Sequence, residues 1–266
     1  DDSVEQMEVI IKNAIEKNIS EICFTDHVDY GIKIDHDIFK QMSDDEKQKF
    51  EKVLNVDYPN YFKEIETLKN KYKNQITIKQ GLEFGIQTHT VKKFQQLFDS
   101  YDLDFIILSC HQANDKEFWN YNYQNGKTED EYNLGYYEEI YKCIHLYHDY
   151  SILGHLDLIQ RYNKTIYPFE KSRDIITKIL KKVIEDGKGI EVNTSSFAYK
   201  LKDLTPSKEI LKLYYELGGK IITIGSDSHK AESIGSHIPL IQQELKNIGF
   251  SHFCTFDKME PVFHEL

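Results

Sequence analysis

Histidine and acidic residues lie at or near the ends of apolar runs at several places in this chain. The residues concerned are His27 in FTDH, Glu83 in GLEFG, His111 in LSCH, His155 in LGHLD, and Asp227 and His229 in GSDSH. Neutral imidazoles beside carboxylates suit borderline divalent metals such as zinc, manganese or iron. These groups are more than one zinc ion needs, and a glutamate can bridge two ions. The sequence therefore predicts a cluster of metal ligands able to hold more than one ion.

Each of these residues also has a purely structural explanation. A histidine at a strand end is more often a partly buried hydrogen-bonding group than a ligand. Glu83 could pair with a lysine, and Asp227 could cap the next helix. Their coincidence on successive strands favours the metal cluster. The other histidines lie on expected loops or helices and are interpreted as solvated or structural; they are His36, His89, His145, His148, His237, His252 and His264.

The elements that must position these groups alternate along the chain. Apolar runs predict strands at 20–27, 75–85, 103–111, 151–157, 187–195, 220–229 and 251–256. Amphipathic segments predict helices at 4–15, 61–72, 91–101, 136–150, 169–186, 207–219 and 238–250. This alternation is typical of parallel strands with helices packed outside, as in a doubly wound sheet or a barrel. No glycine-rich phosphate loop follows a strand, which disfavours a nucleotide-binding doubly wound sheet.

In a barrel, functional groups gather at the carboxyl ends of the strands. Because strand side chains alternate between faces, Asp227 and His229 are expected to point into one pocket while Ser228 points away. The same alternation is expected to separate Cys110 from His111. The chain has no internal repeat and no low-complexity linker, so a single domain over 1–266 is predicted, with surface insertions at about 31–57 and 112–130.

Composition excludes several classes of protein. The 44 acidic residues outnumber the 33 basic ones, for a net charge of -11, which argues against a nucleic-acid partner. The four cysteines form no CxxC pair, so neither a disulfide framework nor a thiolate zinc site is expected, and a cytoplasmic location fits. No apolar run approaches the roughly 18 residues of a membrane span. The sequence does not indicate an oligomeric state.

The motifs FTDH, GLEFG, SCH, GHLDLIQRY, EVNTS and GSDSH occur in an order that resembles the PHP family of metal-dependent phosphoesterases. The family is named for polymerases and histidinol phosphatases, and the resemblance covers nearly the whole chain. It implies an α/β fold, a distorted (β/α)7 TIM-like barrel that usually holds three metal ions. By this resemblance His27 and His229 share one ion, and His111 and His155 hold another. Glu83 bridges two ions, and Asp227 completes an ion that Glu83 also binds.

The segment GHLDLIQRY most resembles the histidinol-phosphate phosphatase branch. That branch implies hydrolysis of L-histidinol phosphate to L-histidinol and phosphate, a step of histidine biosynthesis, by a metal-bound hydroxide. It also implies that Arg161 clasps the substrate phosphate, which a guanidinium can do bidentately. A surface ion pair is the alternative for Arg161. Asn193 and Thr194 are candidates to touch phosphate or substrate, with turn capping as the alternative.

The leaving alkoxide must receive a proton. Asp227 and His229 are the candidate catalytic donors, beside a metal-bound water. The aromatic residues Phe118, Trp119, Tyr121 and Tyr123 either cover the pocket and stack on an imidazole, or pack within their insertion.

One departure from the family pattern affects the metal count. The first family motif, an HxH on the first strand, is absent and would lie immediately before Asp1. The expectation is that the chain lacks its natural N-terminus, and with it the first strand. The alternative is a lineage that lost those ligands, which would leave a degenerate, non-catalytic barrel. Other rivals are a protein-tyrosine or general phosphomonoester phosphatase on the same barrel, a nuclease, and a metal-dependent amidohydrolase.

Overall fold

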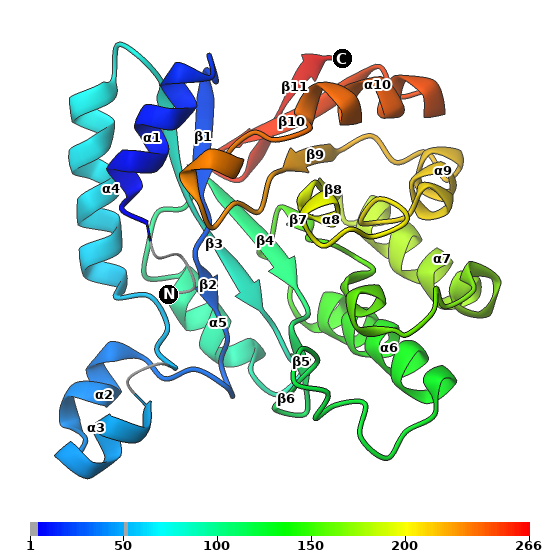
Figure 1. The fold of residues 1–266 in the computed structure, drawn as a ribbon, viewed down its shortest axis with the longest axis horizontal. Helices are drawn as coiled ribbons and strands as arrows, with labels where there is room; N and C mark the ends of the chain where they lie inside the picture. Colours follow the sequence, from blue (N-terminus) through cyan, green and yellow to red (C-terminus); the bar gives the residue numbers. More distant parts are fainter. Residues whose placement is uncertain (1–4, 51–52) are drawn as a thin grey trace.

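The centre of the molecule is a curled parallel sheet (Figure 1). The computed structural model describes residues 5–50 and 53–266. Seven strands make up this sheet in the order β1-β3-β4-β7-β8-β9, with β2 paired to β3 as well, and every pairing in it is parallel. Its strands are β1 Glu21–Phe24, β2 His27–Val28, β3 Thr77–Gly85, β4 Phe105–Ser109, β7 Ile152–Leu153, β8 Gly189–Asn193 and β9 Ile222–Gly225.

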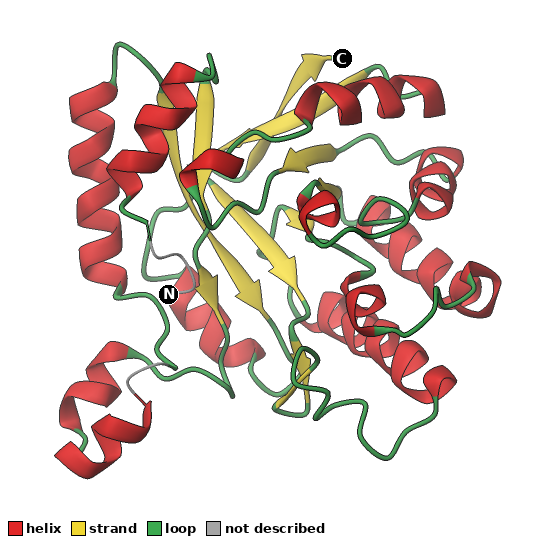
Figure 2. Cartoon of the chain, in the orientation of Figure 1, coloured by secondary structure: helices red, strands yellow, loops and turns green. Residues whose placement is uncertain are grey.

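Helices pack around the curled sheet, most of them on its outer side (Figure 2). They are α1 Met7–Glu16, α2 His36–Gln41, α3 Asp44–Phe50, α4 Tyr58–Tyr72, α5 Val91–Phe98, α6 Glu129–Leu146, α7 Phe169–Glu185, α8 Ser195–Ala198, α9 Lys208–Glu216 and α10 Ile238–Ile248, with 3-10 turns η1 Leu158–Tyr162 and η2 Ala231–Ser233. Helix α7 illustrates why they pack there, since its Ile176, Ile179, Leu180 and Val183 form one buried stripe. No described helix has the length and apolar character needed to cross a membrane.

The predicted fold class is confirmed at the level of an α/β fold with a curled parallel sheet and outer helices. Two details of the prediction were wrong. Residues 20–27 form two strands instead of one, and the chain ends in an antiparallel hairpin of β10 His252–Asp257 and β11 Glu260–Glu265. Strand β11 was missed because Pro261 reads as a breaker, although an edge strand tolerates it. His252 and His264 therefore lie on strands, not on loops or helices.

The two segments predicted as insertions have structure of their own. The first, 31–57, contains α2 and α3, which project from one end of the molecule (Figure 1); positions 51 and 52 lie outside the described residues. The second, 112–130, contains the small hairpin of β5 Gln112–Ala113 and β6 Lys116–Glu117. Helix α6 begins at Glu129, earlier than predicted, because Thr128 and Glu131 form a capping box.

The aromatic residues of the second segment divide into two pairs. Phe118 and Tyr123 are buried in the hydrophobic core, as the packing alternative requires. Trp119 and Tyr121 are 63% and 57% exposed. The segment is thus anchored by one pair of rings and presents the other to solvent.

A cavity of about 490 Å³ lies along the inside of the curl. Strands β1 and β9 end the sheet order, and each pairs with a single strand among the described residues. Both contribute lining residues, including the apolar Ile22 and Ile224. The cavity continues to His27, Glu83 and Asp227, so it connects the inside of the sheet with the candidate site.

Candidate metal centre

Glu83 is the focus of the candidate site. It lies near the carboxyl end of β3, where it is in register with His27 of β2, and it is 5% exposed. His111 and His155 each follow the end of a strand, β4 and β7, by two residues. His111 Nε2 lies 3.0 Å and His155 Nε2 2.9 Å from Glu83 Oε1, and His27 Nε2 lies 3.3 Å from Glu83 Oε2. Parallel strands have therefore brought three imidazoles around one buried carboxylate.

The electrostatics of this group fit a divalent cation. Within the described residues Glu83 pairs with three imidazoles and with no lysine or arginine. Burial alone would raise the pKa of Glu83, but the imidazoles lower it well below its usual range. Burial alone would lower the pKa of His111, but Asp29 and Glu83 outweigh burial and raise it to about 10. The buried carboxylates of Glu83 and Asp29 thus favour positive charge beside them, which a metal ion supplies while leaving the imidazoles neutral.

The donor atoms are also spaced as a ligand set. Glu83, His111 and His155 each offer one atom within 4.8 Å of the others, and His111 Nε2 lies 3.3 Å from His155 Nε2. Nitrogen and carboxylate donors of this kind suit zinc. These three residues therefore form one group able to hold a cation.

A second group contains His27, Asp227 and His229, whose ligand atoms again lie within 4.8 Å of one another. The sequence analysis expected Asp227 and His229 to share a face of one strand. That reason was wrong, because β9 ends at Gly225 and both residues lie in the loop that follows. Asp227 has a positive φ of 46°, and His155 one of 22°. Such backbone strain persists where the surrounding structure enforces it, most often at functional sites. His111 likewise lies beyond the end of its strand, β4.

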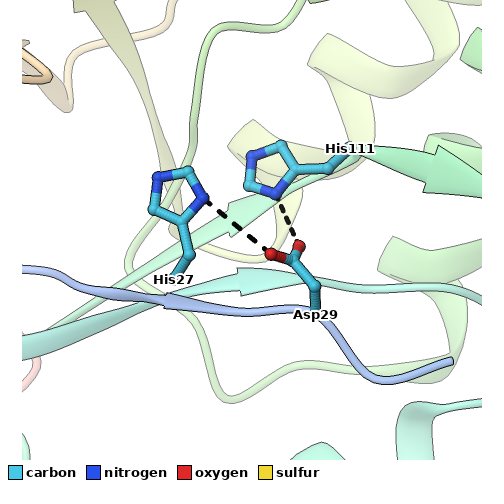
Figure 3. A group of neighbouring side chains, drawn as sticks. All are labelled: His27, Asp29 and His111. Atoms are coloured by element: carbon cyan, nitrogen blue, oxygen red, sulfur yellow. Dashed lines mark hydrogen bonds and ion pairs between the residues drawn. The ribbon is translucent and has the colours of Figure 1, made fainter. Parts of the chain in front are cut away.

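Asp29 was missed from the sequence. Figure 3 shows its carboxylate between His27 and His111, and Asp29 Oδ1 lies 2.7 Å from His111 Nδ1. Lys33 Nζ lies 3.2 Å from its other oxygen. The spacing His27-x-Asp29 at a strand end was an available signal, since residues two apart in extended chain share a face. A carboxylate on the second ring nitrogen fixes the orientation of a histidine whose first nitrogen faces a metal.

Comparison with known proteins identifies the family. The sequence profile of the PHP domain matches residues 1–195. This chain belongs to the PHP domain family.

Relatives of this PHP domain align over nearly its whole length. A histidinol-phosphatase of Lactococcus lactis is 31% identical over 264 residues, covering 97% of this chain and 91% of the relative. A probable histidinol-phosphatase of Clostridium acetobutylicum is 30% identical, covering 99% and 92%. The crystal structure of the Lactococcus lactis histidinol phosphate phosphatase, complexed with zinc, L-histidinol and phosphate, has a TM-score of 0.83 at 30% identity, covering 98% of this chain and 94% of that chain.

Arg161 lies beside the second group of this PHP domain. Its Nη2 is 3.6 Å from Asp227 Oδ2 and donates to Ser195 Oγ at 2.6 Å, and the guanidinium stacks over the Tyr199 ring at 4.4 Å. The side chain is only 7% exposed, which argues against a solvated surface ion pair. Its Nε is buried without a hydrogen-bond partner. A buried guanidinium with an unused donor is suited to an anionic ligand.

The other two candidates for substrate contact are buried. Asn193 is 1% exposed and makes all its hydrogen bonds within the protein. Thr194 is 3% exposed, and its hydroxyl has no partner among the described residues.

Glu191 was not singled out from the sequence. It is 4% exposed and lines the cavity. Burial, with Glu83 and Asp227 nearby, raises the pKa of Glu191 to about 8.

Proposed function

We propose that this PHP domain is a metal-dependent phosphomonoesterase that hydrolyses L-histidinol phosphate to L-histidinol and phosphate. The observation that carries the proposal is the buried Glu83 carboxylate facing three imidazoles, with the Arg161 guanidinium beside the neighbouring Asp227. Positive charge around a phosphoryl group is what hydrolysis of a phosphate ester requires. The names of the relatives, and the zinc, histidinol and phosphate of the similar structure, support this substrate.

The site would hold two or three divalent ions, with zinc favoured over manganese or iron, and two of them would be held by the two groups. Glu83, His111 and His155 would hold one ion, and His27, Asp227 and His229 another. Bound metal would supply a water of lowered pKa and neutralise the phosphoryl oxygens. His27 contacts Glu83 and also lies against His229, with ring centroids 5.7 Å apart, so the two groups are adjacent.

The residues of the chain itself would bind phosphate and move protons. Arg161 would hold the phosphate through its fork of N–H donors. Asp227 and His229 are the candidate donors to the leaving oxygen, and their side chains are 14% and 40% exposed. The more exposed His229 is easier for a substrate to reach, whereas Asp227 is already engaged by Arg161 and Asn193.

A comparison of substrates tests the proposed function. Phosphate release should be fastest, by kcat/KM, from L-histidinol phosphate, compared with a phosphotyrosine peptide and p-nitrophenyl phosphate. Activity should disappear with a chelator and return with zinc or manganese. Equal or better turnover of the two aryl phosphates would support the tyrosine or general phosphatase alternative. Failure to hydrolyse any of them, with metal bound, would support a non-catalytic barrel.

Asp29→Asn tests the role assigned to the second nitrogen of His111. Asparagine keeps the shape but removes the charge that orients the ring, so zinc should bind about 10- to 100-fold more weakly. Competition with a chromogenic chelator measures this affinity. Asp115→Asn is the matched control, because Asp115 also pairs with a histidine, His89, at 2.9 Å, outside the cluster. Equal zinc affinity in Asp29→Asn and wild type would remove Asp29 from the site.

Three finer predictions remain part of this proposal. If β1 and β2 are counted as one interrupted strand, the sheet has six strands, and a seventh seated between β1 and β9 would close the barrel. The two sheet edges and the cavity between them support this closure. A single domain over 1–266 is compatible with the one large hydrophobic core. A cytoplasmic location is supported by the free state of all four cysteines.

A further inference from the structure

The side-chain amide of Asn193 is completely engaged inside the protein. Asn193 ends β8, and its Nδ2 donates to Glu191 Oε2 at 3.1 Å and to Asp227 Oδ2 at 3.2 Å. Its Oδ1 accepts from the backbone N–H of Ser195 at 3.0 Å and from the Ser195 hydroxyl. An asparagine amide has two donor hydrogens and two acceptor lone pairs, and here all four are used.

The partners also determine which way the amide points. An ionised carboxylate can only accept and a backbone N–H can only donate, so the nitrogen must face Asp227 and the oxygen must face Ser195. Asn193 is 1% exposed, and with all four positions of its amide used it has no spare hydrogen bond for a substrate.

The three partners of Asn193 lead to different parts of the site. Asp227 belongs to the second candidate metal group. Glu191 Oε2 also accepts from the backbone N–H of His155 at 3.2 Å, next to the first group. Because the Ser195 hydroxyl donates to Asn193, its oxygen is free to accept the 2.6 Å bond from Arg161 Nη2. One amide thus connects both metal groups and the guanidinium.

We propose that Asn193 is a positioning residue that fixes the Asp227 carboxylate for metal binding and, through Ser195, fixes Arg161 for phosphate. This inference rests on the proposed function, because it assumes that the site binds metal and phosphate. It replaces the substrate contact predicted for Asn193 from the sequence. Turn capping, the alternative from the sequence, explains only the bond from Ser195 N–H, whereas the bonds to Asp227 and Glu191 lead away from that turn.

Two measurements on Asn193→Ala and Ser195→Ala separate the branches of this network. The first is the chelator concentration that removes half of the bound zinc. The second is the inhibition constant of inorganic phosphate at saturating zinc. Asn193→Ala should release zinc at about 10- to 100-fold lower chelator concentration, the range known for residues that orient metal ligands. Ser195→Ala should keep its zinc and weaken phosphate inhibition about tenfold, because Arg161 loses its acceptor while Asn193 keeps its bonds to Asp227, Glu191 and the backbone N–H of residue 195.

Ser196→Ala is the matched control. Ser196 follows Ser195 in α8, is 2% exposed, and its hydroxyl has no hydrogen-bond partner among the described residues. Both measurements on Ser196→Ala should therefore match wild type. Should Asn193→Ala fail to fold, Asn193→Asp keeps the acceptor for Ser195, removes both amide hydrogens and places a further carboxyl group beside Glu191 and Asp227. It should then lower kcat more than it raises KM, because the phosphate-binding branch through Ser195 is kept.

The outcomes distinguish this inference from the proposed function. Unchanged zinc release in Asn193→Ala, with weaker phosphate inhibition, would make Asn193 a substrate ligand and overturn the inference. Equal loss of zinc in Asn193→Ala and Ser195→Ala would reduce both to general support of the loop, which also overturns it. If wild type binds no zinc or releases no phosphate from L-histidinol phosphate, the proposed function itself fails.

Discussion

Glu83→Gln is expected to reduce kcat for L-histidinol phosphate by at least about 10²- to 10³-fold, the range found when a preorganised charged or polar group is removed from an active site. Glutamine has nearly the same shape but no charge. In the wild type, three imidazoles lie 2.9 to 3.3 Å from the Glu83 carboxylate oxygens. In the variant, the amide must turn its N–H groups toward at least one of these imidazoles. Zinc bound per chain should fall with activity.

Thermal unfolding distinguishes this effect from misfolding. Zinc should raise the Tm of the wild type, because a ligand that binds only the folded state stabilises it, and this rise should be lost in Glu83→Gln. The zinc-free variant should still unfold cooperatively, but at a lower Tm than zinc-free wild type, because the imidazoles that lower the pKa of Glu83 lose their buried carboxylate partner. Glu216→Gln, at an exposed position of α9, is the control. Full zinc binding and activity in Glu83→Gln would contradict the assignment.

Arg161→Lys is expected to lower kcat/KM for L-histidinol phosphate about 100-fold, with weaker inhibition by inorganic phosphate. Lysine keeps the positive charge but loses the planar fork that binds phosphate bidentately. It also loses the stacking on Tyr199 and the geometry that reaches Ser195 and Asp227 together. Zinc content should stay at the wild-type level, because Arg161 is not a ligand.

Arg173→Lys in α7 is the matched control for this substitution. Its side chain is 50% exposed and, among the described residues, contacts Glu170 and Phe169 of the same helix, so activity should not change. An Arg161→Lys variant with wild-type kcat/KM and phosphate inhibition would show that Arg161 serves packing and not phosphate.

The gathering of His27, Glu83, His111 and His155 could be predicted from the sequence for a physical reason. Each follows or ends an apolar run, and in a parallel sheet the carboxyl ends of such runs meet at one edge. The exact path of the chain beyond the strands could not be predicted in this way. Asp227 and His229 approach each other through a loop that includes a positive φ, which strand alternation does not describe.

The supporting residues were harder to find because their roles depend on contacts between distant segments. Asp29 contacts His111, 82 positions away, and Asn193 contacts Asp227, 34 positions away. Asn193 was singled out from its place at a strand end, but its saturated hydrogen bonds are visible only in three dimensions. Local signals were nevertheless available for two features, the capping box at Thr128 and the spacing of Asp29 from His27.

The most direct test is the anomalous scattering of zinc in crystals of the protein grown or soaked with the metal. Data collected on both sides of the zinc absorption edge locate the ions without reference to activity. A strong peak should lie among Glu83 Oε1, His111 Nε2 and His155 Nε2, with another beside His27, Asp227 and His229. Zinc peaks found only elsewhere, or none in crystals containing zinc in excess, would contradict the claim that these strand ends form a metal centre.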